Sequence, residues 1–161
     1  LRYVLRDLAA ESGAFAYEYT GYLANIHSVE TYYQANIDML DLHKFYSLFS
    51  PNQKIHTKVK NEEPTYYAPG CEVNTSQFAS GSIVEGKVVR SVVSRNVQIH
   101  KDSLVKESIV FPRVVIGEGA QVEYAIIDKG AEVADGVVIR GTAENPVVIK
   151  KGEKVTEDIL S

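Results

Sequence analysis

The chain has 161 residues, of which 45% are hydrophobic and 24% charged, with a formal net charge of −4 and one cysteine. This composition is typical of a soluble globular protein, and a single cysteine excludes an intrachain disulfide. The acidic balance without a Lys/Arg cluster argues against nucleic acid as a partner. No apolar run approaches the ~20 residues that span a bilayer, and no secretion signal is indicated, so we expect a cytoplasmic protein with no membrane partner.

Tyrosine and valine are unevenly distributed along the chain. Nine of the ten tyrosines precede residue 70, whereas eighteen valines follow it and only three precede it. This shift predicts two architectures in one chain. We expect the end of an α/β domain at residues 1–50, a connector rich in turn residues at 51–70, and a β domain at 71–161.

The N-terminal part predicts a helix, a strand and two further helices. Residues 1–12 place apolar side chains on one helical face before a glycine. Aromatic residues alternate with small or polar ones over 15–19, which predicts a half-buried strand. Ser28 is a candidate N-cap for a helix over 29–40. A second helical stretch at 42–49 ends before a proline.

From residue 71 on, branched apolar residues recur at a period of six. Val93, Ile99, Val105 and Phe111 share this spacing, and the phase restarts at Ile116 after a slip of one residue. Such hexads predict coils of short parallel strands, whose inward side chains form a core only when the coils stack. The pattern resembles the left-handed parallel β-helix. The alternative is a β-sandwich, whose strands would alternate at a period of two.

Several segments carry a more specific resemblance. The sequences GYLANIHS at 21–28 and YYQANIDML at 32–40 resemble the motifs Gly-Tyr-Trp-x-Asp-Val-Gly-Thr and Tyr-x-x-Ala-Asn-x-Asp-Leu-Leu of glucose-1-phosphate adenylyltransferases (ADP-glucose pyrophosphorylases). Residues 88–94, 108–112 and 125–129 match family segments in the same order. The chain is therefore identified as similar to this family. The resemblance implies a mainly β fold, a left-handed β-helix after a short α/β remnant of a nucleotidyltransferase domain.

The resemblance also implies a reaction for the complete enzyme. Family members convert ATP and glucose 1-phosphate to ADP-glucose and pyrophosphate with Mg²⁺, for glycogen biosynthesis. Catalytic members carry Asp at the position of Asn25, where it helps to hold Mg²⁺, and an amide is a poor replacement because Mg²⁺ prefers carboxylates. Leu23 and His27 also depart from the motif.

These departures resemble GlgD-type subunits, which are catalytically degenerate and assemble with a catalytic subunit that they modulate. The resemblance therefore predicts a hetero- or homo-oligomer. We expect no catalytic residue in this chain, only a degenerate metal position at Asn25. We also expect no cofactor in the chain, because the family's Gly-rich nucleotide-binding segment is absent from it; Mg²⁺ and ATP belong to the complete enzyme.

Three basic residues are candidates for an effector site. Lys129 resembles a lysine that contributes to the site for a phosphorylated activator in some family members, although a solvated turn lysine is an alternative. Arg90 and Arg113 are candidates for further phosphate contacts, with ordinary surface charge as the alternative.

Three other functions stay open. The chain could belong to a catalytic subunit that tolerates Asn25, or it could be a scaffold without an effector site. It could also be a hexapeptide-repeat acyltransferase with His100 as general base. His100 directly follows an inward position, so a solvent-facing side chain is the simpler interpretation. Cys71 is interpreted as a small buried residue rather than a nucleophile.

Overall fold

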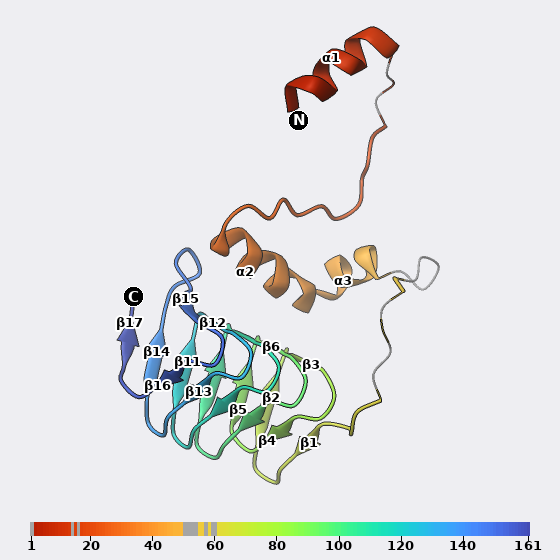
Figure 1. Ribbon diagram of the computed structural model, residues 1–161. Coiled ribbons are helices and arrows are strands. Elements are labelled where there is room, and N and C mark those ends of the chain that lie inside the picture. The colour runs from red at the N-terminus through yellow and green to blue at the C-terminus, as the bar shows by residue number, and fades with distance from the viewer. Residues whose placement is uncertain (1, 14, 16, 50–54, 57, 59–60) are drawn as a thin grey trace.

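The structure, a computed structural model, describes residues 2–13, 15, 17–49, 55, 56, 58 and 61–161 (Figure 1). Helices come first and short strands follow. None of the helices described is long and apolar enough to span a membrane. The helical elements are α1 (Arg2–Ser12), α2 (Val29–Ile37), the 3-10 turn η1 (Asp38–Leu40) and α3 (Leu42–Leu48).

Each strand pairs with the strand three positions earlier in the chain, so that the strands form three parallel sheets. Sheet A contains β1 (Tyr66–Tyr67), β4 (Ile83–Val84), β7 (Gln98–Ile99), β10 (Val115–Ile116), β13 (Glu132–Val133) and β16 (Lys154–Val155). Sheet B contains β2 (Glu72–Asn74), β5 (Lys87–Val89), β8 (Leu104–Lys106), β11 (Gln121–Glu123), β14 (Val138–Arg140) and β17 (Ile159–Leu160). Sheet C contains β3 (Gln77–Phe78), β6 (Val92–Val93), β9 (Ile109–Val110), β12 (Ala125–Ile127) and β15 (Val147–Ile149).

The core is a column of branched apolar side chains inside the coils. Ile99, Ile116, Val133 and Val155 occupy one register position in successive strands of sheet A. Their exposed fractions are 1%, 0%, 2% and 5%. All strand pairs among the described residues are parallel. The predicted parallel β-helix is thus confirmed, and the β-sandwich alternative is wrong because strands neighbouring in sequence lie on different faces.

Coil length explains the slips in the hexapeptide pattern. Val115 pairs with Gln98 and with Glu132, each 17 residues away, so these coils are one residue shorter than three full hexads. The phase of the sequence pattern therefore shifts once in each of them. An earlier coil is shorter still, because Ile83 pairs with Gln98, 15 residues on. One later coil is longer: Ala125 pairs with Val147, 22 residues on, and residues 141–146 form the loop that precedes β15 (Figure 1).

A ladder of serines, of which Ser91 and Ser108 are buried, links one corner of successive coils. Ser91 donates its amide to Ser76 Oγ (3.1 Å), and Ser108 donates its amide to Ser91 Oγ (3.2 Å). The ladder ends at Ala125, whose amide donates to Ser108 Oγ (3.1 Å). The hydroxyls of Ser91 and Ser108 donate to the carbonyls two residues earlier, at 2.8 and 2.7 Å. This serine ladder (Ser76, Ser91 and Ser108) provides acceptors for the backbone amides of Ser91, Ser108 and Ala125 at the corner between the sheets.

The β-helix begins earlier than the sequence indicates. The expected boundary at residue 71 follows the last turn signal, but β1 already lies at Tyr66–Tyr67. Its partner strand sets this start, because the Tyr66 amide donates to the Ser82 carbonyl (2.8 Å) and the Ala68 amide donates to the Val84 carbonyl (2.8 Å). Part of the predicted connector at 51–70 is therefore already the first coil.

The predicted strand at 15–19 is wrong. Helix α1 forms as expected, but the described residues of 15–19 have no regular structure. Phe15 and Tyr17 are 99% and 90% exposed. A strand needs a neighbour to complete its hydrogen bonds, and the described part of the chain places none beside this segment. The described N-terminal part is therefore helical rather than α/β.

Helix α2 begins at the predicted N-cap. The Thr31 amide donates to Ser28 Oγ (3.1 Å), and the Ser28 amide donates to Thr31 Oγ1 (3.0 Å), which completes a capping box. The expected single helix over 29–40 is shorter, because α2 ends at Ile37 and η1 follows. Helix α3 then starts with Asp41 as its own N-cap.

Helix α2 packs on the outside of the β-helix. Tyr33 and Ile37, which are 2% and 6% exposed, contact Ile109 and Ile126 on the outer face of sheet C. The Tyr33 hydroxyl donates to the Glu107 carbonyl (2.7 Å). Burial, chiefly, raises the pKa of Tyr33 well above its ordinary value. The helix is thus held by apolar contact and by one long-range hydrogen bond.

Candidate functional site

Basic turns stack along the corner of the β-helix that connects sheet C with sheet A. Arg95 follows β6, Arg113 follows β9 and Lys129 follows β12. The Arg113 amide donates to the Arg95 carbonyl (3.1 Å), and the Gly130 amide donates to the Pro112 carbonyl (3.0 Å). These backbone bonds bring residues distant in sequence onto neighbouring coils.

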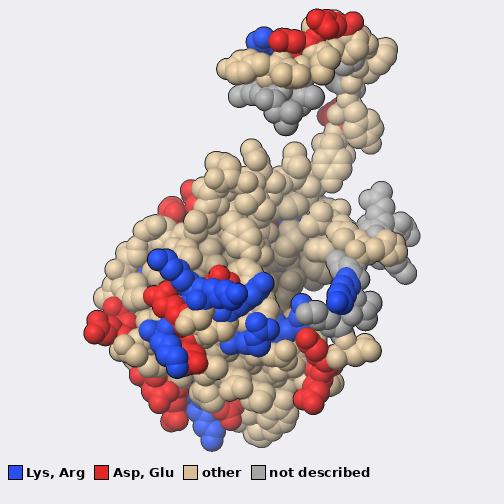
Figure 2. Space-filling view, in the orientation of Figure 1, with Lys and Arg blue, Asp and Glu red and all other residues tan. Residues whose placement is uncertain are grey.

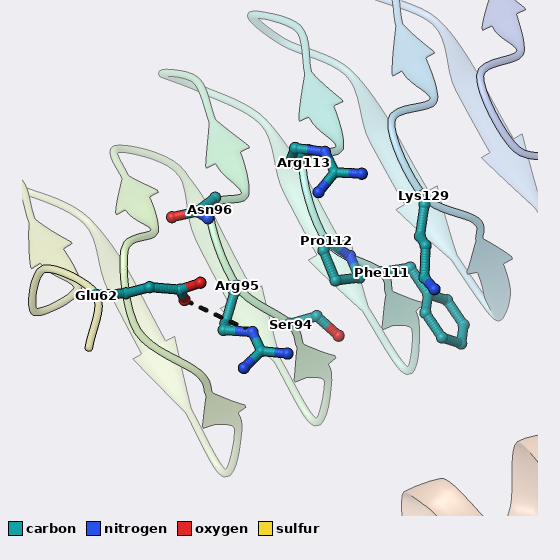
Figure 3. A pocket seen from close by; sticks show the side chains of 8 residues that line it. All are labelled: Glu62, Ser94, Arg95, Asn96, Phe111, Pro112, Arg113 and Lys129. Atoms are coloured by element: carbon teal, nitrogen blue, oxygen red, sulfur yellow. Dashed lines mark ion pairs between the residues drawn. The ribbon is translucent and has the colours of Figure 1, made fainter. Parts of the chain in front are cut away.

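The three basic side chains line one pocket of about 360 Å³, which we call the corner pocket (Figure 3). Apolar and neutral polar groups complete its walls. Arginine and lysine side chains that converge on one pocket are suited to bind phosphate or carboxylate groups. The corner pocket is lined by Glu62, Ser94, Arg95, Asn96, Phe111, Pro112, Arg113 and Lys129.

The charges of the corner pocket are only partly neutralised. Arg95 Nε lies 3.5 Å from Glu62 Oε2. Within the described part of the chain, Arg113 and Lys129 have no ion-pair partner, and both are exposed. The Asp128 carboxylate, adjacent to Lys129, accepts the Lys129 amide (2.7 Å). The pocket therefore has a surplus of positive charge.

On the β-helix outside the corner pocket, several of the basic side chains have an acidic neighbour. The face seen in Figure 2 interleaves basic and acidic groups. On sheet B, Glu123 lies between Lys106 (3.5 Å) and Arg140 (2.9 Å). Such exposed pairs contribute little to stability, but they cancel the local field. Because three basic side chains and a single carboxylate line the corner pocket, it is the candidate for an anion site.

The structure brings together two of the three predicted effector residues. Arg113 and Lys129 line the corner pocket, but Arg90 does not. Arg90 Nε donates to Glu107 Oε1 (2.6 Å), and Arg90 lines a different cavity, of about 470 Å³, beside α2 and α3. Sequence reasoning missed Arg95 and Glu62. Aligning the turns coil by coil would have placed Arg95 next to Arg113, but the slips in the hexad phase conceal that alignment.

Asn25, the predicted degenerate metal position, is exposed in the segment before α2. Its carbonyl oxygen lies 3.1 Å from His27 Nδ1. Among the residues that the structure describes, no group of three or more His, Cys, Asp or Glu side chains is placed to hold a metal ion. The metal position at Asn25 stays a prediction, because Mg²⁺ is often held by only one or two carboxylates together with phosphate oxygens and water.

His100 and Cys71 lie at other places on the β-helix. His100 is 43% exposed in its side chain, and its Nδ1 lies 3.3 Å from Glu85 Oε2. It lines a cavity of about 220 Å³ together with Glu132 and Lys154, which form an ion pair at 2.8 Å. The hydrogen bond from Lys154 to Glu132 raises the pKa of Lys154. Cys71 is half-buried and packs against the core.

Comparison with known sequences agrees with the fold. A model of the family described as "GlmU-like, C-terminal hexapeptide" matches residues 59–158. The chain is 38% identical over 136 residues to the glycogen biosynthesis protein GlgD of Bacillus subtilis (strain 168). It is 32% identical over 137 residues to the glucose-1-phosphate adenylyltransferase of Corynebacterium jeikeium (strain K411). It is 31% identical over 140 residues to that of Bacillus mycoides (strain KBAB4).

These matches cover most of this chain but less than half of each relative. The shares of this chain are 84%, 82% and 86%, and the shares of the relatives are 40%, 34% and 37%. The chain thus spans about two fifths of the length of the curated relatives that it matches. By its hexapeptide coils and by the family match over residues 59–158, the chain belongs to the GlmU-like C-terminal hexapeptide family, and over most of its length it is similar to part of GlgD and of glucose-1-phosphate adenylyltransferases.

Proposed function

We propose that the chain is the regulatory and assembly part of a GlgD-type subunit, which associates with a catalytic glucose-1-phosphate adenylyltransferase subunit in glycogen biosynthesis. The complete complex would convert ATP and glucose 1-phosphate to ADP-glucose and pyrophosphate, with Mg²⁺ and ATP bound by other parts of the complex. The corner pocket of this chain would bind a phosphorylated effector.

One observation carries this proposal: three basic side chains line the corner pocket, and two of them, Arg113 and Lys129, were predicted from sequence as effector contacts. A phosphate group that reaches both cations gains charge-assisted hydrogen bonds. The similarity to a glycogen biosynthesis protein GlgD supports the subunit type. Catalytic members of the family carry Asp at the position of Asn25, and the loss of that carboxylate in this chain supports a role without direct catalysis.

Association is tested with the complete protein co-expressed with the catalytic subunit from the same genome. We expect a mixed oligomer by size-exclusion chromatography with light scattering. We also expect altered effector kinetics relative to the catalytic subunit alone. Separate elution of the two proteins together with unchanged kinetics would overturn the regulatory proposal.

The effector pocket is tested in that mixed oligomer with Lys129→Ala. Loss of one charge-assisted contact should weaken effector activation about tenfold, as read from the half-saturating concentration. Lys101→Ala is the matched control, because Lys101 is also an exposed turn lysine of the β-helix but lies outside the corner pocket. Equal responses of the two variants would favour a solvated turn lysine.

The degenerate position is tested by Asn25→Asp in the complete protein with its partner. Restoring the carboxylate should raise Mg²⁺-dependent turnover if the rest of that site persists. Assay of the complete protein alone separates a regulatory subunit from a catalytic one: substantial turnover by the unsubstituted protein would identify a catalytic subunit that tolerates Asn25.

A further inference from the structure

The corner pocket already contains an anionic group from the chain itself. Glu62 precedes β1, and Figure 3 shows its carboxylate pointing from this segment toward Arg95. Arg113 and Lys129 lie on the coils beyond it. The Glu62 carboxylate thus occupies a position next to Arg95 that an oxygen of an external phosphate or carboxylate ligand could take.

The Glu62 carboxylate is poorly satisfied in this place. Its Oε2 is buried and receives no hydrogen bond from any described residue. The distance of 3.5 Å to Arg95 Nε is an ion-pair contact rather than a good hydrogen bond. A buried carboxylate oxygen without a hydrogen-bond donor is energetically unfavourable. An external anion that accepts a hydrogen bond from Arg95 at normal distance therefore binds there more favourably than the Glu62 carboxylate does.

Glu62 is nevertheless held close to the pocket. Thr65 Oγ1 donates to the Ala79 carbonyl (2.7 Å), and the Tyr66 amide donates to the Ser82 carbonyl (2.8 Å). Only a few residues separate Glu62 from these anchors. Because the segment is short, the carboxylate has a high effective concentration at Arg95, and it returns when no external ligand is present.

We propose that Glu62 is a tethered competitor for the anion site, which a phosphorylated ligand displaces from Arg95 on binding in the corner pocket. The proposal rests on the proposed function of that pocket and adds its regulation. Displacement exchanges one loosely paired carboxylate for a ligand that carries more negative charge and more acceptor oxygens. It releases the Glu62 side chain from Arg95, while Thr65 and Tyr66 keep their bonds to Ala79 and Ser82.

The test uses the complete protein and inorganic phosphate as probe, titrated by isothermal calorimetry. Glu62→Gln keeps the size of the side chain and removes its charge, so phosphate should bind about fivefold more tightly. Glu63→Gln is the matched control: Glu63 is adjacent but exposed and outside the pocket, and its substitution should change little. In a Lys129→Ala background, the effect of Glu62→Gln should be reduced.

A second measurement uses the unsubstituted protein alone. The side-chain carboxylate ¹³C signal of Glu62 should shift in nuclear magnetic resonance spectra when phosphate is added, because the carboxylate leaves Arg95. The signal of the exposed Glu63 should stay in place and serves as the internal control.

The two proposals fail in different ways. If Lys129→Ala weakens phosphate binding while Glu62→Gln leaves the affinity unchanged and phosphate leaves the Glu62 carboxylate signal in place, the pocket is an anion site and the competitor is refuted. If phosphate affinity is the same in Lys129→Ala, in Glu62→Gln and in the unsubstituted protein, the proposed effector site is itself refuted, and the competitor with it.

Discussion

Large apolar side chains are buried in the β-helix but exposed in the segment between α1 and α2. Inside the coils, Ile116 is fully buried between Ile99 and Val133 of adjacent strands. In the segment before α2, Phe15 and Leu23 are 99% and 82% exposed. An apolar pattern therefore leads to burial only where a neighbouring surface is supplied. The β-helix supplies its own surface with every coil, and the N-terminal segment does not.

The largest expected effect comes from the core of the coils. Ile116→Ala removes methyl groups from a site with 0% exposure, so the free energy of unfolding should fall by about 2–5 kcal/mol. Ile83→Ala in the same sheet is the control, because Ile83 is 44% exposed and should cost less than about 1 kcal/mol. Urea unfolding measures both. Equal losses would contradict the assignment of inward and outward positions.

The serine ladder should give the next largest effect. Ser91→Ala leaves the buried Ser108 amide without its acceptor, which should lower the free energy of unfolding by about 1–3 kcal/mol. Ser47→Ala serves as comparison, since Ser47 is exposed on α3 and bonds only within its own helix. If urea unfolding shows no difference between these variants, the ladder does not contribute to the stability of the coils.

The packing of the helices should depend modestly on acid. Burial of Asp38 acts to raise its pKa, but hydrogen bonds from Lys44, Gln34 and Tyr22 outweigh burial and hold the pKa below 3.8. A lowered pKa in the folded state stabilises the fold above the unfolded value, and this contribution disappears as the pH falls through the folded value. Asp38→Asn should therefore destabilise the protein by about 1 kcal/mol at neutral pH.

This difference between Asp38→Asn and the unsubstituted protein should begin to fade below pH 3.8 and disappear as the pH falls through the lower pKa of folded Asp38, where the native carboxyl becomes protonated. Thermal unfolding followed over pH measures it, with Asp102→Asn in an exposed turn as control. A difference that is constant over the whole pH range would refute the electrostatic explanation.

The smallest effect is expected in the N-terminal segment. Phe15→Ser changes a side chain that touches almost nothing, so the free energy of unfolding should stay within about 0.5 kcal/mol. Ile109→Ser, on the outer face of sheet C beneath α2, should be far more damaging because Ile109 is only 2% exposed. A large loss in Phe15→Ser would show that this segment is packed after all, and would remove the contrast between the two regions.

The sequence was sufficient to predict the β-helix because each hexad places one branched residue, such as Val105 or Ile116, at the same inward position. The Ser28 cap was predictable for a similar reason, since its hydrogen bonds depend only on residues a few positions away. The irregular structure of the described residues in 15–19 was not predictable. Alternation of aromatic and small residues shows which side chains would share a face of a strand, but it does not show whether a partner strand exists.

The corner pocket was predictable only in part. Lys129 and Arg113 were identified one at a time, from resemblance and charge, but their approach depends on how many residues each corner uses. Arg95 was missed for that reason. The contact of Glu62 with Arg95 depends on the path of the segment before β1, which follows no periodic pattern.

The serine ladder has a consequence for how the chain finds its register. Coils with interchangeable apolar faces could pair one whole turn out of place and still bury similar side chains. Such a shift would set Ala125 against a coil that requires a hydroxyl, and a buried amide would lose its acceptor. In the native arrangement, the coil after Ala125 needs no hydroxyl, because the Val147 amide donates to the Tyr124 carbonyl (3.1 Å). The serine ladder thus distinguishes one coil from the next. An assembly misaligned by one turn leaves a buried amide without an acceptor and is therefore less stable than the native register.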